Sequence, residues 1–328
     1  MKQLLKLSAA SLLVVGALSV QASTLSDVQA KGHVSCGVSK GLAGFSSADS
    51  SGTWTGIDVD VCRAVAAATL GDATKVKFVP LTAKERFTAL QSGEIDMLSR
   101  NTTWTITRDA SLGLNFAGVN YYDGQGFMVK SSLGVSSAME LSGAAICIQA
   151  GTTTELNLAD WGKANGIEYN SVVSDTNAQT LTNYDAGRCD VLTTDASGLY
   201  SMRAGANDPS EHVVLPEIIS KEPLGPVVRQ GDDQWFNIVR WSLNAMITAE
   251  EIGVNSGNVD DVSNNPERER LMGRSGSTHE YVGLTPDWTY QIVKQVGNYA
   301  ESFERNIGLS TPIGIARGVN ALWSDGGI

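Results

Sequence analysis

The sequence predicts an α/β protein of two similar lobes, each a sheet flanked by helices, joined by a two-strand hinge. Two observations predict this fold class: strands and helices alternate once before residue 123 and again after it, and a helical segment follows the second series. That last segment needs a surface to pack on, and we expect it to return to the first lobe. The chain then crosses between the lobes twice, near 123–127 and 221–226. We expect residues 23–124 and 225–328 to form lobe 1 and residues 125–224 to form lobe 2.

Length and composition agree with two globular lobes of ordinary size. The chain has 328 residues, of which 42% are hydrophobic and 18% are charged. Removal of residues 1–22, which carry Lys2 and Lys6, leaves 22 of the 24 basic residues against 35 acidic ones, a net charge of -13. Such an acidic chain repels phosphate backbones, so we expect no nucleic acid partner.

The first 22 residues are typical of a cleaved secretory signal. Lys2 and Lys6 precede an apolar centre at Leu12–Val15, and the small-residue end Val20-Gln21-Ala22 resembles a cleavage site. No later segment approaches the roughly 18 to 20 apolar residues of a membrane span. We therefore expect an exported protein that begins near Ser23.

The first series of elements reads as a βαβαβ unit. A strand at 34–38 leads to a helix at 57–70 with Asp58 as its expected cap, and a second strand follows at 76–80. Thr82 and Glu85 form a capping box that opens the next helix, which Gly93 ends before a third strand at 95–98.

The second series repeats this order. The expected elements are a strand at 145–149, a helix from Thr153, a strand at 168–173, a helix at 178–186 and a strand at 189–193. The glycine stop and aspartate of Gly93-Glu-Ile-Asp96 recur in Gly187-Arg-Cys-Asp190. A long helix at 232–252, with apolar residues near 3.6 spacing, opens the tail.

Four cysteines in an exported chain favour disulfides over metal ligation, because none lies in a Cys-x-x-Cys pair or near a histidine. Three connectivities are possible. We predict Cys36–Cys62 and Cys147–Cys189, since pairs that are local in sequence keep each crosslink inside one folding unit.

Polar residues follow the strands where a parallel sheet places ligand contacts. The segment from Arg100 to Arg108 includes Asn101 and Thr103, and an arginine offers two parallel donors to a carboxylate. Asp195 stands at the matching strand end of lobe 2 and could accept an ammonium group. The alternatives are surface arginines and an aspartate that only caps the helix at 196–202.

The turn Gly151-Thr-Thr-Thr-Glu155 follows a strand and opens a helix, so its free amides suit an anion. The local sequence alone favours a simpler role, in which Thr152 and Glu155 form only a capping box. Phe45 and Trp54, after the first strand, could wall an apolar part of a ligand, although aromatic residues more often belong to the core.

An enzyme is the alternative class. Gly37-Val-Ser-Lys-Gly41 matches a nucleophile-elbow pattern, with Asp195 and then His212 or His279 in hydrolase order. However, no clean helix follows Ser39, and such a short pattern arises by chance among 34 glycines. The histidines show no metal-binding spacing and neither lobe opens with a phosphate or dinucleotide fingerprint, so we expect no metal and no cofactor.

Together these motifs resemble the periplasmic solute-binding proteins of polar amino acid ABC transporters, most closely the general L-amino-acid-binding branch. The resemblance covers essentially all of the chain after residue 22. Its most specific segments are Gly56-Ile-Asp-Val-Asp-Val-Cys62, Leu98-Ser-Arg-Asn-Thr-Thr-Trp-Thr105, Tyr121-Tyr-Asp-Gly-Gln-Gly-Phe127 and Gly318-Val-Asn-Ala-Leu-Trp323.

The resemblance implies a type II periplasmic binding protein fold and a monomer in the periplasm. Such a protein captures free L-amino acids, of broad or polar and acidic specificity, and delivers them to the permease of an ABC transporter in the inner membrane. It also implies that Arg108 and Thr103 bind the ligand's α-carboxylate together with Thr152 and Thr153, and that Asp195 accepts its α-ammonium.

Two points stay open under this resemblance. Arg100 replaces the usual small residue at its position, and we expect it to reach the ligand side chain, with a structural ion pair as the alternative. Exported enzymes such as cyclohexadienyl dehydratases share the fold, as do sensor domains fused to membrane proteins. No fused segment is present in this sequence, and an enzyme would need a general acid or base in the cleft.

Overall fold

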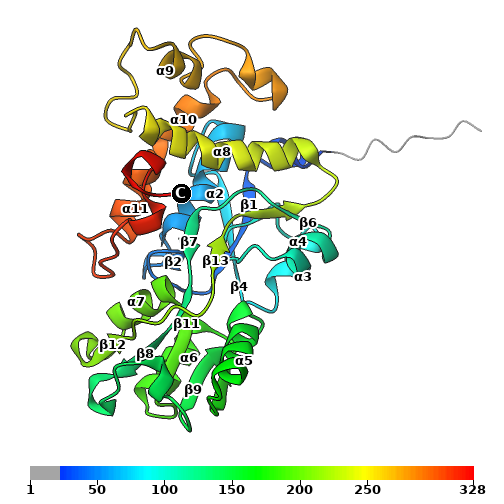
Figure 1. The fold of residues 1–328 in the computed structure, drawn as a ribbon. Coiled ribbons are helices and arrows are strands. Elements are labelled where there is room, and N and C mark those ends of the chain that lie inside the picture. The colour runs from blue at the N-terminus through cyan, green and yellow to red at the C-terminus, as the bar shows by residue number, and fades with distance from the viewer. Residues whose placement is uncertain (1–22) are drawn as a thin grey trace, which may run out of the picture.

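The computed structural model describes residues 23–328, and the predicted signal segment lies outside the described residues. The chain forms two α/β lobes, one above the other in Figure 1, with a narrow connection between them. The predicted fold class is confirmed. Among the described residues no helix combines the length and apolar composition that crossing a bilayer demands.

The larger lobe contains a five-stranded sheet in the order β4-β1-β5-β14-β6. Its strands are β1 (Val34–Ser39), β4 (Val76–Leu81), β5 (Met97–Leu98), β6 (Leu114–Phe116) and β14 (Val227–Arg229). β1 runs parallel to β4 and β5, while β14 is antiparallel to β5 and β6. A short ribbon of β2 (Ser47–Ala48) and β3 (Trp54–Thr55) lies in the connection after β1.

The helices of this lobe pack on the sheet or on one another outside it. They are α1 (Thr24–Lys31), α2 (Ile57–Leu70), α3 (Arg86–Gln91), α4 (Ile106–Ser111), α8 (Asp233–Glu251), α9 (Pro266–Leu271), α10 (Trp288–Gln295) and α11 (Tyr299–Asn306). The tail packs on this lobe: α8 and α10 contact α2, and the Trp235 indole N–H donates to the carbonyl of Asp96 at 2.9 Å.

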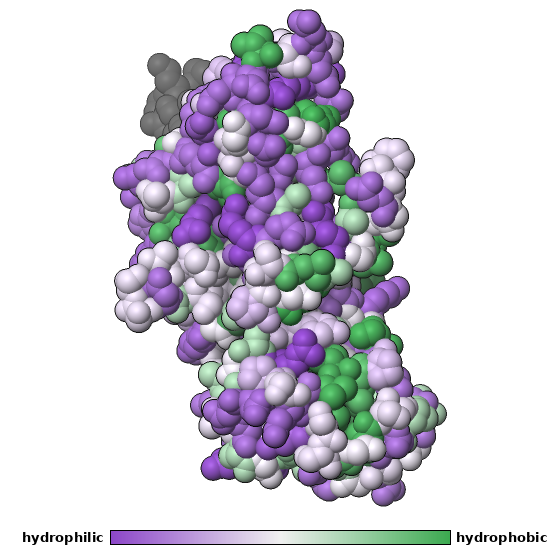
Figure 2. All heavy atoms as spheres, turned by 90° about the vertical axis from the view of Figure 1, so that its left-hand side faces the viewer, coloured by the Kyte–Doolittle hydropathy of each residue, from purple (hydrophilic) through white to green (hydrophobic). Residues whose placement is uncertain are grey.

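The smaller lobe repeats the design with the sheet order β10-β9-β11-β8-β12. Its strands are β8 (Gln125–Lys130), β9 (Ala145–Gln149), β10 (Asn170–Ser174), β11 (Val191–Asp195) and β12 (His212–Val214), and its helices are α5 (Thr153–Asn165), α6 (Asn177–Asp185) and α7 (Ala196–Ala204). β9 is parallel to β10 and β11, and β8 is antiparallel to β11 and β12. Figure 2 shows an apolar area on the face of this lobe, whose exposed apolar side chains include Leu133 and Ile218.

Two strands join the lobes. β7 (Tyr121–Asp123) and β13 (Glu222–Leu224) pair antiparallel, with Asp123 directly opposite Glu222. The tail braces this ribbon from outside, because the side-chain amide of Asn320 accepts from the Tyr122 N–H at 2.7 Å and donates to its carbonyl at 3.0 Å.

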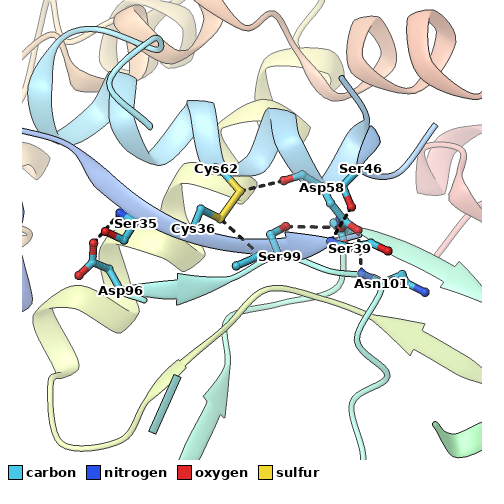
Figure 3. The surroundings of a disulfide bond; sticks show 11 residues. Ser35, Cys36, Ser39, Ser46, Asp58, Cys62, Asp96, Ser99 and Asn101 are labelled. Atoms are coloured by element: carbon cyan, nitrogen blue, oxygen red, sulfur yellow. Dashed lines mark hydrogen bonds between the residues drawn. A yellow bond between two sulfur atoms is a disulfide. The ribbon is translucent and has the colours of Figure 1, made fainter. Parts of the chain in front are cut away.

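Both predicted disulfides are confirmed. Cys36 of β1 bridges to Cys62 of α2 with a Cα–Cα distance of 6.1 Å, and Cys147 of β9 bridges to Cys189 before β11 at 5.6 Å. Figure 3 shows the first bridge between the strand and the helix that covers it. Each bridge therefore lies within one lobe.

The prediction that Asp58 caps α2 was wrong. The helix begins at Ile57 after Gly56, whose φ of 134° only glycine adopts readily, and the Asp58 side chain is buried. Its carboxylate accepts from the Asn101 N–H at 2.7 Å and the Asn120 side-chain amide at 2.8 Å (Figure 3 shows the former). Asp58 thus supports the loop that follows β5, and burial raises its pKa to about 6.

Candidate functional site

Charged side chains of both signs gather where the carboxyl ends of the strands in the two lobes face each other. Three buried arginines come from the larger lobe: Arg86 begins α3, Arg100 follows β5, and Arg108 lies in α4. They face Asp195 at the end of β11 in the smaller lobe, as their mutual effects on pKa indicate. This is the position at which open α/β sheets bind ligands.

Arg108 and Arg100 are each held by one backbone acceptor. Arg108 Nη1 donates to the carbonyl of Thr103 at 2.9 Å, and Arg100 Nε donates to the carbonyl of Leu81 at 3.0 Å. Their other guanidinium nitrogens donate to no atom of residues 23–328 within hydrogen-bond distance. Burial lowers the pKa of Arg108 and lowers that of Arg100 to about 10, so both side chains favour an added negative charge.

Arg86 was missed by the sequence analysis. Its side chain is 2% exposed, and its guanidinium reaches the Thr102 hydroxyl at 3.4 Å and, across the cleft, the carbonyl of Gly151 at 3.5 Å. Its Nε finds no acceptor among the described residues. Burial, together with Arg108 and Arg100, lowers the pKa of Arg86 well below its ordinary value. An arginine in the first turn of a helix is ordinarily exposed, so only its place after the Thr82–Glu85 capping box could have drawn attention to it.

Asp195 occupies the N-cap position of α7, but its side chain makes no cap hydrogen bond. It is buried, and among residues 23–328 no donor lies within hydrogen-bond distance of its carboxylate. Burial raises its pKa well above the ordinary value, and the nearby Asp123 and Glu222 raise it further, against the effect of Arg108. Asp195 is therefore poised to accept a cationic donor.

Two hinge carboxylates, also missed as site residues, flank Asp195. Asp123 accepts from the N–H and hydroxyl of Ser197, and burial raises its pKa to about 6. Glu222 accepts from Thr153 at 3.0 Å and from the side-chain amide of Asn157 at 2.6 Å. A charge on a short strand carries little sequence signal, because strand residues of this kind are ordinarily solvated.

The structure brings Thr103 and Thr153 together across the cleft, with their hydroxyl oxygens 3.4 Å apart. Thr152 lies beside them at the start of α5, and its hydroxyl donates to the carbonyl of Gln149 at 2.8 Å. The capping box considered for Thr152 and Glu155 is not formed: the Glu155 carboxylate accepts from the N–H of Gly151, which precedes the N-cap Thr152, and no side chain caps the first amides of α5. The helix start is thus free to bind an anion.

The remaining predicted residues lie around this group in different ways. Asn101 has a φ of 32°, and its side-chain oxygen is buried without a donor among the described residues. Phe45 is 1% exposed and packs edge-to-face on Tyr121, with ring centroids 5.5 Å apart. Trp54 packs instead on Phe78 of the edge strand β4 at 5.6 Å, and no interaction among the described residues joins it to the charged group.

Comparison with known proteins places this site in a family. The sequence profile of the bacterial extracellular solute-binding proteins, family 3, matches residues 34–256. The general L-amino acid-binding periplasmic protein AapJ of Rhizobium johnstonii is 61% identical over 97% of this chain and 95% of its own. The glutamate/glutamine/aspartate/asparagine-binding protein BztA of Rhodobacter capsulatus is 56% identical, over 96% and 94% of the two chains.

A solved structure agrees with these relatives. The ABC transporter/periplasmic binding protein of Brucella ovis with glutathione bound superposes with a TM-score of 0.91 at 58% identity. The match covers 94% of this chain and 98% of that one. These relatives are binding proteins, and none of them supports the alternative of an enzyme.

Proposed function

Because this chain belongs to family 3 of the bacterial extracellular solute-binding proteins, we propose that it captures free L-amino acids in the periplasm and delivers them to the permease of an ABC importer. The observation that carries the ligand class is the opposition of charges in the cleft. Arg108 in one lobe faces Asp195 in the other, and both are buried. The α-carboxylate and α-ammonium of an amino acid complement this pair, since a buried charge without a partner is costly.

In this proposal each lobe contributes part of the ligand's contacts. Arg108 and Thr103 of the larger lobe bind the α-carboxylate, with the uncapped start of α5 at Thr152 and Thr153 completing the anion site. Asp195 accepts the α-ammonium. Neither lobe alone satisfies the ligand, so binding favours the closed arrangement.

The side-chain subsite favours a second negative charge. One arginine suffices for an α-carboxylate, yet Arg86 and Arg100 lie buried beside Arg108 with most of their guanidinium N–H groups without protein acceptors. Glutamate and aspartate would supply the missing acceptor. The names of two relatives support this reading, since BztA binds acidic amino acids and their amides and the Brucella protein holds glutathione, which has two carboxylates.

We place the protein in the periplasm as a monomer after removal of residues 1–22, and we assign it no chemistry of its own. The function of the relatives supports this placement. Closure would present a surface built from both lobes to the permease.

A thermal-shift screen of the protein from Ser23 onwards tests the ligand class. L-Amino acids should raise the unfolding temperature, whereas D-enantiomers, α-amides and decarboxylated amines should not. The amides and the amines lack the α-carboxylate that Arg108 is proposed to bind, and a D-enantiomer held by Arg108 and Asp195 directs its side chain elsewhere. Equal stabilisation by the decarboxylated amines would contradict the proposal. Mass spectrometry of the ligand released after incubation should recover it unchanged, and a different compound would favour the enzyme.

A further inference from the structure

The two hinge strands carry a pair of carboxylates, one half-buried and one buried, that the proposed ligand contacts do not use. Asp123 on β7 lies directly opposite Glu222 on β13 in the antiparallel register. Glu222 is 1% exposed, and both side chains bind the first turns of helices in the smaller lobe. These two helices, α7 and α5, are the ones that carry Asp195 and Thr153.

Asp123 caps α7 from outside the helix. The Ser197 N–H, in the first turn of α7, points at both carboxylate oxygens of Asp123 at 3.4 and 3.3 Å, and the Ser197 hydroxyl donates to one of them. An N-cap side chain normally satisfies such an amide, and here that residue would be Asp195. Because the hinge supplies the cap, the carboxylate of Asp195 is left free for a ligand.

Glu222 fixes the direction of a hydrogen-bond chain between the lobes. The Thr153 hydroxyl donates its single proton to the Glu222 carboxyl group at 3.0 Å. In the pair of hydroxyls 3.4 Å apart, Thr103 must then be the donor and Thr153 the acceptor. The chain runs from the larger lobe through α5 to the hinge, and Asn157 and Ser220 hold its end at 2.6 Å each.

We propose that Asp123 and Glu222 are positioning residues of the ligand site, which tie the first turns of α7 and α5 to the hinge strands and thereby couple ligand contact at Asp195 and Thr153 to lobe closure. This inference rests on the proposed function for its ligand. The anchoring itself depends only on contacts within the chain.

The same carboxylates govern the charge of Asp195. Six charged or titratable groups interact electrostatically with Asp195. The hinge strands contribute Tyr121, Asp123 and Glu222, and the larger lobe contributes Arg86 of α3, Arg100 of the loop after β5 and Arg108 of α4. The two carboxylates raise the pKa of Asp195, whereas a ligand ammonium favours its ionised form. Binding therefore releases protons below the free-state pKa, and removal of either hinge charge reduces that release.

Paired substitutions separate anchoring from charge. Asp123→Ala and Glu222→Ala remove the anchors, while Asp123→Asn and Glu222→Gln retain the shape and most hydrogen bonds but remove the charge. Asp96→Asn and Asp96→Ala are the matched controls, because Asp96 is a buried carboxylate of the larger lobe that accepts from the Ser35 N–H and Lys31 near the other end of β1. Amide hydrogen exchange of the ligand-free proteins measures the anchors. Calorimetry with L-glutamate in buffers of different ionisation enthalpy measures affinity and proton release.

We expect Asp123→Ala to speed exchange in the first turn of α7 and Glu222→Ala to do so in the first two turns of α5, each with a loss of about tenfold in affinity, which equals about 1.4 kcal/mol. Asp123→Asn and Glu222→Gln should release fewer protons on binding at pH 5 to 7, whereas the Asp96 variants should match the wild type in all three readouts. Unchanged exchange in both alanine variants, or unchanged proton release in both charge variants, would overturn the inference. A wild-type protein that binds no L-amino acid would count against the proposed function, and the exchange comparison would still decide the anchoring.

Discussion

Arg108 is the residue on which the proposed ligand contact depends most directly. It is buried, its pKa is lowered by that burial, and the carbonyl of Thr103 satisfies only one of its N–H groups. We expect Arg108→Ala to weaken L-amino acid binding by about 3 to 5 kcal/mol, as deletion of one partner of a desolvated charge pair does. Calorimetry measures this loss, and a change below tenfold would place the carboxylate elsewhere.

We expect Arg100 to determine which amino acid side chains the ligand site prefers. Because its free N–H groups lie beside those of Arg86 and Arg108, Arg100→Ala should cost L-glutamate about 1.5 to 3 kcal/mol and leave L-leucine almost unaffected. Arg229→Ala is the control, since Arg229, like Arg100, donates to backbone carbonyls, here those of Leu90 and Ile95, but takes no part in the charged group around Asp195. Equal losses for the two ligands in Arg100→Ala would indicate a structural role.

We expect the Asp195 carboxylate to lower the stability of the ligand-free protein at neutral pH, although ligand binding requires it. Its pKa is raised in the folded ligand-free protein, so folding takes up a proton, and the stability it contributes is present below about pH 4 and is lost as the pH rises through the folded-state pKa. Asn does not titrate, so Asp195→Asn should flatten the dependence of the unfolding free energy on pH. Because the variant has no buried carboxyl group to ionise, it should be more stable than the wild type at neutral pH.

Chemical denaturation between pH 4 and pH 8 measures this effect, and Asp160→Asn, on the exposed face of α5, is the control. A variant that is less stable than the wild type at neutral pH would contradict the prediction. Amino acid binding by Asp195→Asn should be lost in either case, because the amide cannot replace the anionic partner of an ammonium.

The site residues that the sequence predicts are those at the ends of strands, where topology alone fixes the neighbourhood. Arg100 and Asp195 follow this rule, whereas Arg108 lies in α4, after the loop that Arg100 opens. The three side chains lie close enough to influence one another's pKa. Arg86 and Glu222 do not follow it, because their proximity depends on how far a helix start and a hinge strand lean into the cleft. That inclination arises from tertiary packing, which local patterns do not contain.

At the scale of elements, apolar periodicity and helix caps predict that a helix or strand exists better than they predict where it begins and ends. The helix expected at 232–252 is α8, and the strand expected at 145–149 is β9. The strand expected at 189–193 starts two residues later, because Cys189 is bound to Cys147 before the ladder begins. The predicted helix caps are less reliable. The Asp58 side chain is buried and accepts from Asn120, and Asp195 makes no cap hydrogen bond to α7, which the hinge residue Asp123 caps instead.

Each disulfide lies within a single lobe, so each should stabilise the folded protein without restraining lobe closure. They span 26 and 42 residues, which corresponds to about 3.5 and 4 kcal/mol in the chain-entropy account. We expect Cys36→Ser/Cys62→Ser and Cys147→Ser/Cys189→Ser each to lower the unfolding temperature and to leave affinity within about threefold of the wild type. A large loss of affinity in a variant that remains folded would show that a bridge shapes the cleft itself.

At the scale of the whole molecule, the structure shows the lobes in contact on several sides of the cleft. Lys84 pairs with Asp175 at 2.8 Å, the Ser201 hydroxyl donates to the carbonyl of Ala43 at 2.8 Å, and Thr103 meets Thr153. The first pair is exposed to solvent and contributes little, so these contacts alone hold the lobes weakly. We therefore expect most of the free energy of lobe closure to come from a charged ligand that bridges Arg108 and Asp195.

That reasoning yields a prediction about shape. Without ligand the hinge should allow the lobes to separate, because the arginines and Asp195 gain solvation when the cleft opens. Saturation with an L-amino acid should then reduce the radius of gyration measured by small-angle scattering. Ser201→Ala, which removes one contact at the rim, should close as the wild type does, whereas Asp195→Asn should remain open at the same ligand concentration. An unchanged radius in the wild type at saturation would indicate a rigid cleft, in which binding energy is not used to bring the lobes together.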